Sequence, residues 1–390
     1  MHLLENAIRS EELLGKTIDI KHRFYASSSE PLRLKDLLAM AAQNNDHRLI
    51  EAYHDHSLGY ADSGGSLDLR QQIAMLYGDN ISAANIVVFP GAQTGMTLSA
   101  QALLHEGDHA IIITPSYQSL EESAKLAGCE ISRVSLSPNN NWQLEIASVE
   151  AAIQNNTRYI ALNDPHNPSG ALLDYDTKLA LISLAEKHDL LIFSDEVYRL
   201  LELDPSERSP SMADLSVRAV ALSTMSKPWG AGGTGIGWVV CQDSVVCSQL
   251  LQAQHIYAVC FSRAGEIQAM MALRSSTEII NKNLGIIAGN LLLLEQYFEL
   301  NNDLFDWVSP RAGGTGFVRF KGPITANQFA QQLLENEILV FPPSIFDCDE
   351  SLSQYFRIGF SRTTMPAALD AFKRYVHSQR SVWQTKTTEF

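Results

Sequence analysis

The chain has 390 residues, of which 45% are hydrophobic and 19% are charged, the balance of a folded globular protein. Lys and Arg total 29 against 44 Asp and Glu, so the formal net charge is -15, and no basic block is present. We therefore expect no nucleic-acid partner and no anionic-membrane partner. No apolar run reaches membrane-spanning length, and the N-terminus lacks the pattern of a secretory signal. The five cysteines are scattered and odd in number, which excludes a disulfide scaffold and a zinc ribbon and favours a cytoplasmic location; no metal ion is expected.

The predicted elements, in chain order, begin with an amphipathic helix over residues 3–14 that ends near Gly15. Short apolar, β-branched segments then alternate with longer segments of helical pattern. The expected strands in this part are 86–89, 110–114, 159–163, 190–194, 218–223 and 235–241, and the expected helices include 95–105, 120–127 and 176–188. This alternation predicts an α/β fold with a mostly parallel central sheet.

The pattern changes after Phe261. A long helix over 263–300 is expected, followed by short strands at 316–320, 337–341 and 357–360, which predicts a smaller α+β domain. We therefore expect two domains. The large one covers 45–270, and the small one consists of 1–44 and 271–390, with its N-terminal segment capping the substrate.

Polar residues follow several of these strands, where ligands collect in doubly wound sheets. The segment Phe89–Thr94 ends a strand and opens a helix whose N–H groups can hold a phosphate, with a plain turn as the alternative. The loop 163–170 is rigid, and its Asn167 is placed to donate to a ligand oxygen. Asp195 ends another strand, either as a helix cap or as a carboxylate that needs a cationic or protonated partner. Lys227 lies in a glycine-rich loop after a third strand, and a desolvated lysine can bond covalently to a carbonyl cofactor.

Together these segments resemble the aminotransferase class I/II family, the fold type I group of pyridoxal-phosphate enzymes, over residues 45–375. The motifs that carry the resemblance are Asn167-Pro168-Ser169-Gly170, Asp195-x-x-Tyr198 and Ser226-Lys227. The resemblance implies pyridoxal 5'-phosphate as cofactor, with Lys227 as its covalent lysine and proton shuttle and Asp195 as partner of the ring nitrogen. The other cofactor contacts it implies are Asn167 and Tyr198 at the ring hydroxyl, Tyr117 stacked on the ring, and Ala92, Gln93, Thr224 and Ser226 around the phosphate.

The resemblance also implies a homodimer with a shared active site. Tyr60, followed by Ala-Asp-Ser-Gly-Gly, resembles the tyrosine that reaches the neighbouring subunit's phosphate, although it could be a surface aromatic. Arg357 resembles the arginine that grips the substrate α-carboxylate, although it could pair with a neighbouring carboxylate. One departure stands out: Gly235 occupies the position where the family has an arginine that neutralises the phosphate. We therefore expect weaker cofactor retention, with Arg263 as one possible substitute.

The layout as a whole is most similar to the capreomycidine synthases of this family, which cyclise a hydroxylated arginine. The shared features include the triple serine 27–29, the run Thr114–Leu120 and the run Pro165–Ala171. The resemblance implies a cyclising lyase that eliminates the hydroxyl of a hydroxylated L-arginine and closes a cyclic guanidino amino acid, capreomycidine- or enduracididine-like.

The N-terminal region supplies the candidate substrate residues for this reaction. Glu12 is predicted to bind the guanidinium, with Asp19 in reserve, and Ser29 lies where family members line the substrate entrance. His22 or Tyr25 could assist proton transfer to the leaving hydroxyl, although His22 could equally be structural.

Two alternative functions stay open. The first is a conventional aminotransferase that moves an amino group from a basic or aromatic amino acid to a 2-oxo acid. The second is a cofactor-binding regulator, a class that carries an N-terminal DNA-binding domain, whereas here the enzyme-like pattern starts almost at once in an acidic chain.

Overall fold

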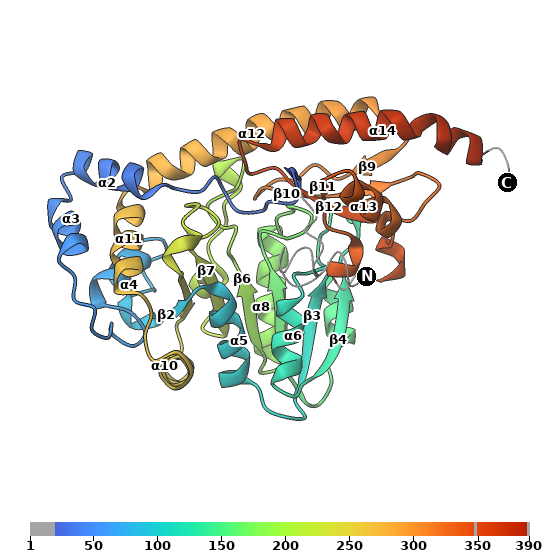
Figure 1. Cartoon of the computed structure of the whole chain (residues 1–390). Coiled ribbons are helices and arrows are strands. Elements are labelled where there is room, and N and C mark those ends of the chain that lie inside the picture. Colours follow the sequence, from blue (N-terminus) through green and yellow to red (C-terminus); the bar gives the residue numbers. More distant parts are fainter. Residues whose placement is uncertain (1–19, 347–348, 388–390) are drawn as a thin grey trace.

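The computed structural model describes residues 20–346 and 349–387 (Figure 1). A seven-stranded sheet forms its centre, with the strand order β2-β8-β7-β6-β5-β3-β4. Strand β8 pairs antiparallel with β2 and β7, and every other neighbouring pair is parallel. The strands are β2 (Ile86–Pro90), β3 (His109–Thr114), β4 (Glu130–Ser135), β5 (Thr157–Asn163), β6 (Leu191–Asp195), β7 (Ala219–Thr224) and β8 (Ile236–Cys241). This is the mostly parallel sheet that the sequence predicts.

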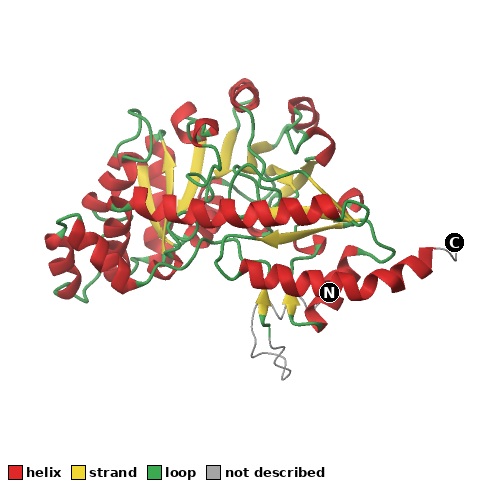
Figure 2. Cartoon of the chain, turned by 90° about the horizontal axis from the view of Figure 1, so that it is seen from above, coloured by secondary structure: helices red, strands yellow, loops and turns green. Residues whose placement is uncertain are grey.

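Helices cover both faces of the sheet because alternate residues of its buried strands point to opposite sides (Figure 2). In β2, Val87 and Phe89 pack into the cluster on one face, and Ile86 and Val88 pack into the cluster on the other. The first face is covered by α5 (Ala92–Leu103), α6 (Ser119–Leu126) and α10 (Ser244–Ala258). The second face is covered by α2 (Leu34–Gln43), α3 (His47–His54), α4 (Leu67–Ala74), α7 (Ile146–Ala151), α8 (Tyr175–Lys187), α9 (Met212–Leu215) and α11 (Arg263–Arg274).

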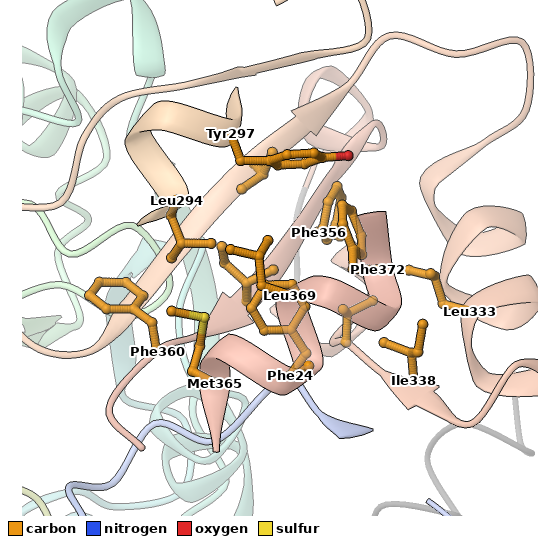
Figure 3. Close-up of a cluster of buried hydrophobic side chains, with 14 of the residues drawn as sticks. Phe24, Leu294, Tyr297, Leu333, Ile338, Phe356, Phe360, Met365, Leu369 and Phe372 are labelled. Carbon is orange, nitrogen blue, oxygen red and sulfur yellow. The ribbon is translucent and has the colours of Figure 1, made fainter. Parts of the chain in front are cut away.

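The C-terminal part has its own small sheets and its own core. Strands β9 (Phe305–Trp307), β10 (Thr315–Phe320) and β12 (Tyr355–Gly359) form an antiparallel sheet, and β1 (His22–Arg23) pairs with β11 (Ile338–Leu339). The helices α12 (Ser276–Leu300) and α14 (Met365–Thr387) run side by side along one end of the molecule, and α13 (Ala326–Glu335) packs beside β11 and β12 (Figure 1). Their buried side chains meet in one cluster that includes Phe24, Leu294, Phe356 and Phe372 (Figure 3).

The structure differs from the sequence prediction at several elements, and the short strands β1 and β9 were not expected. The long helix expected over 263–300 is two helices, α11 and α12, separated at Ser275, whose hydroxyl accepts a hydrogen bond from Asn44 Nδ2 at 3.0 Å. Strand β4 was not predicted, because as an edge strand it carries charged and polar residues on exposed positions. The strand expected at 337–341 is only two residues long, followed by an isolated bridge from Phe341 to Arg357.

Packing also bears on the expected domain division, which stays a prediction. Leu37 and Met40 lie in the same buried cluster as Trp229 and Trp238, so residues before 45 pack on the large sheet as well. The helix expected over 3–14 lies outside the described residues. In the part of the chain that the structure describes, no helix is long and apolar enough to cross a membrane.

Candidate active site

The carboxyl ends of β5, β6 and β7 meet at one edge of the sheet because the three strands are parallel neighbours. Side-chain hydrogen bonds fix the loops that leave this edge. Asn163 Nδ2 donates to the main-chain oxygen of Asp195 at 2.7 Å, and the N–H of Asn167 donates to Asn163 Oδ1 at 2.6 Å. The loop that carries Asn167 is therefore held beside the end of β6.

A cavity of about 410 Å³ opens at this edge. It brings together most of the residues that the sequence singles out, from segments far apart in the chain. Its lining contains Tyr25, Ala92, Gln93, Tyr117, Asn167, Asp195, Tyr198, Thr224, Ser226, Lys227 and Arg357, and also Ser27, Gly91, Met96, Val197 and Phe341, which were not among the predicted site residues.

Lys227 reaches the cavity from the loop after β7. Its Nζ donates to Ser27 Oγ at 3.1 Å and lies 5.4 Å from the centre of the Tyr198 ring. The loop turns sharply at Gly230, which has a φ of 60°, and an added Cβ there would come within 2.0 Å of the Glu30 main-chain oxygen. Only glycine fits this approach, so the lysine loop and the N-terminal segment pack directly against each other.

Asp195 is a buried carboxyl at the end of β6. Burial raises the pKa of Asp195 to about 7, although a hydrogen bond from the Val197 N–H and the charge of Lys227 act in the opposite direction. Its carboxylate form is therefore poised to gain from a cationic partner inside the cavity.

The N-terminus of α5 faces the same cavity through Ala92 and Gln93. Its first N–H groups have no partner within the helix, and the residue before the helix is Gly91, which supplies no side-chain cap. The hydroxyls of Thr224 and Ser226 lie 3.1 Å apart in the lining of the same cavity. Helix N–H groups and two hydroxyls form a cup suited to a phosphate.

Arg357 is a buried cation without a carboxylate partner among the described residues. Its guanidinium donates to Asn167 Oδ1 at 2.9 Å and to the Tyr25 main-chain oxygen at 2.8 Å, and it lies over the Phe341 ring at 4.5 Å. Its Nε is buried and has no hydrogen-bond partner in the structure. Burial lowers the pKa of Arg357. A planar carboxylate that enters the cavity would provide the missing counter-charge.

Several predicted site residues do not line this cavity. His22 lies in β1, where it pairs with Ile338 and borders a separate surface pocket, so the geometry does not support its assignment to proton transfer. Ser29 is buried outside the cavity lining, and its hydroxyl has no partner. Ser27, two residues earlier, faces the cavity instead. The triple serine thus contributes one residue to the cavity lining, and the path of the backbone decides which of the three it is.

Tyr60 and Arg263 lie together in another surface pocket of about 460 Å³. Tyr60 is 89% exposed, and Arg263 forms an ion pair with Glu266. Within this chain, neither residue reaches the cup. Glu12 and Asp19 lie outside the described residues.

Comparison with known proteins matches residues 27–372 to the family described as aminotransferase class I and II. The chain belongs to this family. It is therefore a pyridoxal-phosphate-dependent enzyme of the fold type I group.

Individual relatives differ in reaction. Arginine--pyruvate transaminase from Pseudomonas aeruginosa is 37% identical over 196 residues, which cover 49% of this chain and 50% of that protein. The match thus spans only half of that relative. Capreomycidine synthase from Streptomyces vinaceus is 27% identical over 272 residues, covering 70% of this chain and 68% of that protein. The crystal structure of a PLP-dependent aminotransferase from Streptococcus suis has a TM-score of 0.85 at 25% identity and covers 92% of this chain and 94% of that one.

The cavity fits the family's cofactor by its own chemistry. Asp195, with a pKa raised to about 7, suits a protonated ring nitrogen. The cup at α5 suits the phosphate. Among the described residues, Lys227 has no carboxylate partner that would keep its amine from reacting with the cofactor aldehyde. When bound, pyridoxal phosphate supplies a ring that withdraws electrons from the substrate's Cα.

The structure also shows the surroundings of Gly235, which stands where the family has the phosphate-binding arginine. Gly235 has a φ of 66°, and an added Cβ at this position would meet no atom within 4 Å. In the described part of the chain, the cavity lining contains no arginine or lysine besides Lys227 and Arg357.

Proposed function

We propose that this enzyme acts on an amino acid with a guanidino side chain and that its reaction is transamination with a 2-oxo acid. The observation that carries the proposal is that Arg357, Lys227 and Asp195 line one cavity. They are our candidates for the carboxylate anchor, the amine base and the ring-nitrogen partner. The name of the arginine--pyruvate transaminase supports the choice of substrate.

The chain's own residues divide the work of such a reaction. Arg357 binds the substrate α-carboxylate, which fixes the position of Cα in the cavity. Lys227 Nζ takes the Cα proton and returns a proton to the same region, as a general acid–base group. Asp195 and Asn167 keep the cofactor ring oriented, and the aromatic rings of Tyr25 and Tyr117 limit access of water.

Cyclisation of a hydroxylated arginine is the second candidate, supported by the match to capreomycidine synthase. That reaction needs an additional proton donor for the leaving hydroxyl. Of the two residues predicted for this step, His22 lies away from the cavity, whereas Tyr25 lines it. We rank cyclisation after transamination because the match to capreomycidine synthase is the more distant one, at 27% identity against 37% for the arginine--pyruvate transaminase.

The test is to incubate the purified holoenzyme with arginine and with its β- and γ-hydroxylated forms, with and without pyruvate. Transamination predicts alanine and repeated turnover to a keto acid only when pyruvate is present, and at most one equivalent of keto acid per active site without it. A cyclic product without any oxo acid would support the cyclase instead. If no guanidino amino acid reacts while aspartate or an aromatic amino acid does, the substrate proposal is wrong.

Glu12 remains our proposal for guanidinium recognition, with Asp19 in reserve. The variant Glu12→Gln should raise KM for guanidino substrates and leave a substrate without a guanidine unchanged, because only the former loses a charge-assisted hydrogen bond. Equal effects on both substrates would remove Glu12 from this role.

We also propose a homodimer that works in the cytoplasm, with Tyr60 extending to the partner's phosphate cup. Its high exposure leaves Tyr60 available to a second copy of the chain. The described cysteines are all free thiols, as a reducing compartment requires.

A further inference from the structure

Ser27 contacts the reacting amine of the enzyme. Its Oγ accepts a hydrogen bond from Lys227 Nζ at 3.1 Å, and both side chains line the cavity. This is the one hydrogen bond that the structure gives to Nζ within the described residues. The other contact, with the Tyr198 ring, is a looser cation–π approach of 5.4 Å.

Hydrogen bonds to the neighbours of Ser27 hold this segment in place, and none of them involves the Ser27 side chain. Arg357 donates to the Tyr25 main-chain oxygen at 2.8 Å. Arg362 donates to Ser28 twice, to its main-chain oxygen at 2.7 Å and to its Oγ at 2.6 Å. The strand β12 adds a bond from the Gly359 N–H to the Phe24 main-chain oxygen at 3.0 Å. The position of Ser27 Oγ is therefore set by its neighbours, and losing the hydroxyl should leave the segment in place.

We propose that Ser27 is a catalytic residue that holds the free amine of Lys227 over the cavity. Lysine has a flexible four-carbon stem, and fixing it in one conformation costs rotamer entropy. A hydrogen-bond acceptor at a preset position offsets part of this cost, so Nζ meets the cofactor carbonyl or the substrate Cα in reactive orientation. No proton need leave Ser27, because its hydroxyl only accepts the bond from Nζ.

This role follows from the family's covalent lysine and holds for both candidate reactions. It does not depend on the guanidino substrate, so it can fail while the proposed function stands, and the reverse is also true.

Ser29 offers a matched control within the same segment. It is also a serine, it is 1% exposed, and its Oγ has no partner and does not line the cavity. Its main-chain N–H donates to the Lys227 main-chain oxygen at 3.4 Å, so it shares the same backbone contact with the lysine loop. The two serines thus differ mainly in what their hydroxyls touch.

The first experiment measures capture of the cofactor by the apo-enzyme, which needs no turnover. Pyridoxal phosphate is mixed with apo wild type, Ser27→Ala, Ser27→Cys, Ser27→Thr and Ser29→Ala, and covalent bonding to Lys227 is followed by absorbance. Pyridoxine phosphate, which lacks the aldehyde, gives the non-covalent affinity in parallel. We expect Ser27→Ala and Ser27→Cys to slow capture about 10-fold, the value of one lost hydrogen bond of about 1.4 kcal/mol. Ser27→Thr and Ser29→Ala should match wild type, and pyridoxine phosphate affinity should stay unchanged throughout.

The second experiment uses the holoenzymes in D₂O and measures exchange of the substrate Cα proton. Ser27→Ala should slow exchange by a similar factor at unchanged KM, and Ser27→Thr should restore the rate. Capture and exchange rates in Ser27→Ala equal to those in Ser29→Ala would overturn the proposal. So would a loss of pyridoxine phosphate affinity as large as the loss of capture rate, because it would show general damage to the cavity.

Discussion

Two buried charged groups in the cavity lack a protein counter-ion in the part of the chain that the structure describes. Asp195 is 4% exposed and Arg357 is 2% exposed, and neither forms an ion pair there. Burying an unpaired charge costs several kcal/mol, and a ligand of opposite charge would remove this cost. The two residues therefore mark where opposite charges of the ligands should lie: a cation at Asp195 and an anion at Arg357.

The role of Arg357 is testable with substrates that keep or lack the α-carboxylate. Arg357→Lys should raise KM for the amino acid at least about 10-fold, because lysine cannot reproduce the two-pronged contact with a carboxylate. The α-carboxamide of the same amino acid should be affected little. Steady-state kinetics on both compounds give the comparison, with Arg319→Lys on the exposed side of β10 as control. A similar loss for both compounds would assign Arg357 to structure alone.

Asp195 makes a prediction about pH. Its pKa rises from 3.8 to about 7 in the folded protein, so between these pH values the folded apo-enzyme holds more protons at this carboxyl than the unfolded chain does. Its contribution therefore destabilises the apo-enzyme as pH rises from about 4 to about 7. Asp195→Asn should remove this dependence, so its stability relative to wild type should increase across that window.

Urea unfolding of both apo-proteins at several pH values measures the difference. The exposed Asp176→Asn in α8 serves as control for the removal of a carboxyl group as such. A difference between Asp195→Asn and wild type that stays constant with pH would contradict the raised pKa of Asp195.

At the scale of elements, the site is built from loops that follow the ends of strands. The positions of these loops could be predicted from the sequence. The apolar runs of β5, β6 and β7 are continuous, so their ends and the polar residues after them could be predicted. The path of residues 20–30 could not, because it has almost no regular structure and is positioned by long-range bonds from Arg357 and Arg362. For this reason the sequence pattern pointed to Ser29 and His22 as site residues, whereas in the structure Ser27 lines the cavity.

The loop before β8 provides the next prediction. Gly235 precedes Ile236, whose main-chain oxygen accepts a hydrogen bond from Thr224 of the cup at 3.1 Å, and an added Cβ at Gly235 would meet no atom within 4 Å. Gly235→Arg should therefore slow release of pyridoxal phosphate, because a guanidinium that reaches the cup would neutralise the phosphate. The positive φ of 66° costs about 1 kcal/mol for any side chain. Gly235→Gln carries the same strain without the charge and is the matched control.

Release is followed by absorbance after dilution into a scavenger of free cofactor. We expect about 10-fold slower release for the arginine variant than for the glutamine variant, as one charge-assisted contact gives. Equal rates would mean that the phosphate already has another cation.

At the scale of the whole molecule, one face carries exposed apolar side chains near Tyr60. Leu58 is 93% exposed, and Tyr257 is 66% exposed near the end of α10. The end of α10 contacts the loop after Tyr60, because Ser63 Oγ donates to the Val259 main-chain oxygen at 3.0 Å. Large exposed apolar groups of this kind mark protein interfaces. A two-fold dimer through this face would bury them and carry Tyr60 to the other subunit's cup.

Mixed dimers test whether Tyr60 acts in the partner's site. Tyr60→Ala and Lys227→Ala should each be nearly inactive alone, because the first lacks the contact to the partner's phosphate and the second lacks the amine. When the two are refolded together, about half of the dimers are mixed, and each mixed dimer has one site with both residues intact. We therefore expect recovery to about a quarter of wild-type activity, with light scattering confirming the dimer mass. The chain with both substitutions, refolded with Lys227→Ala, should give no recovery. Dimers that form without any recovery in the first mixture would show that Tyr60 does not serve the neighbouring site.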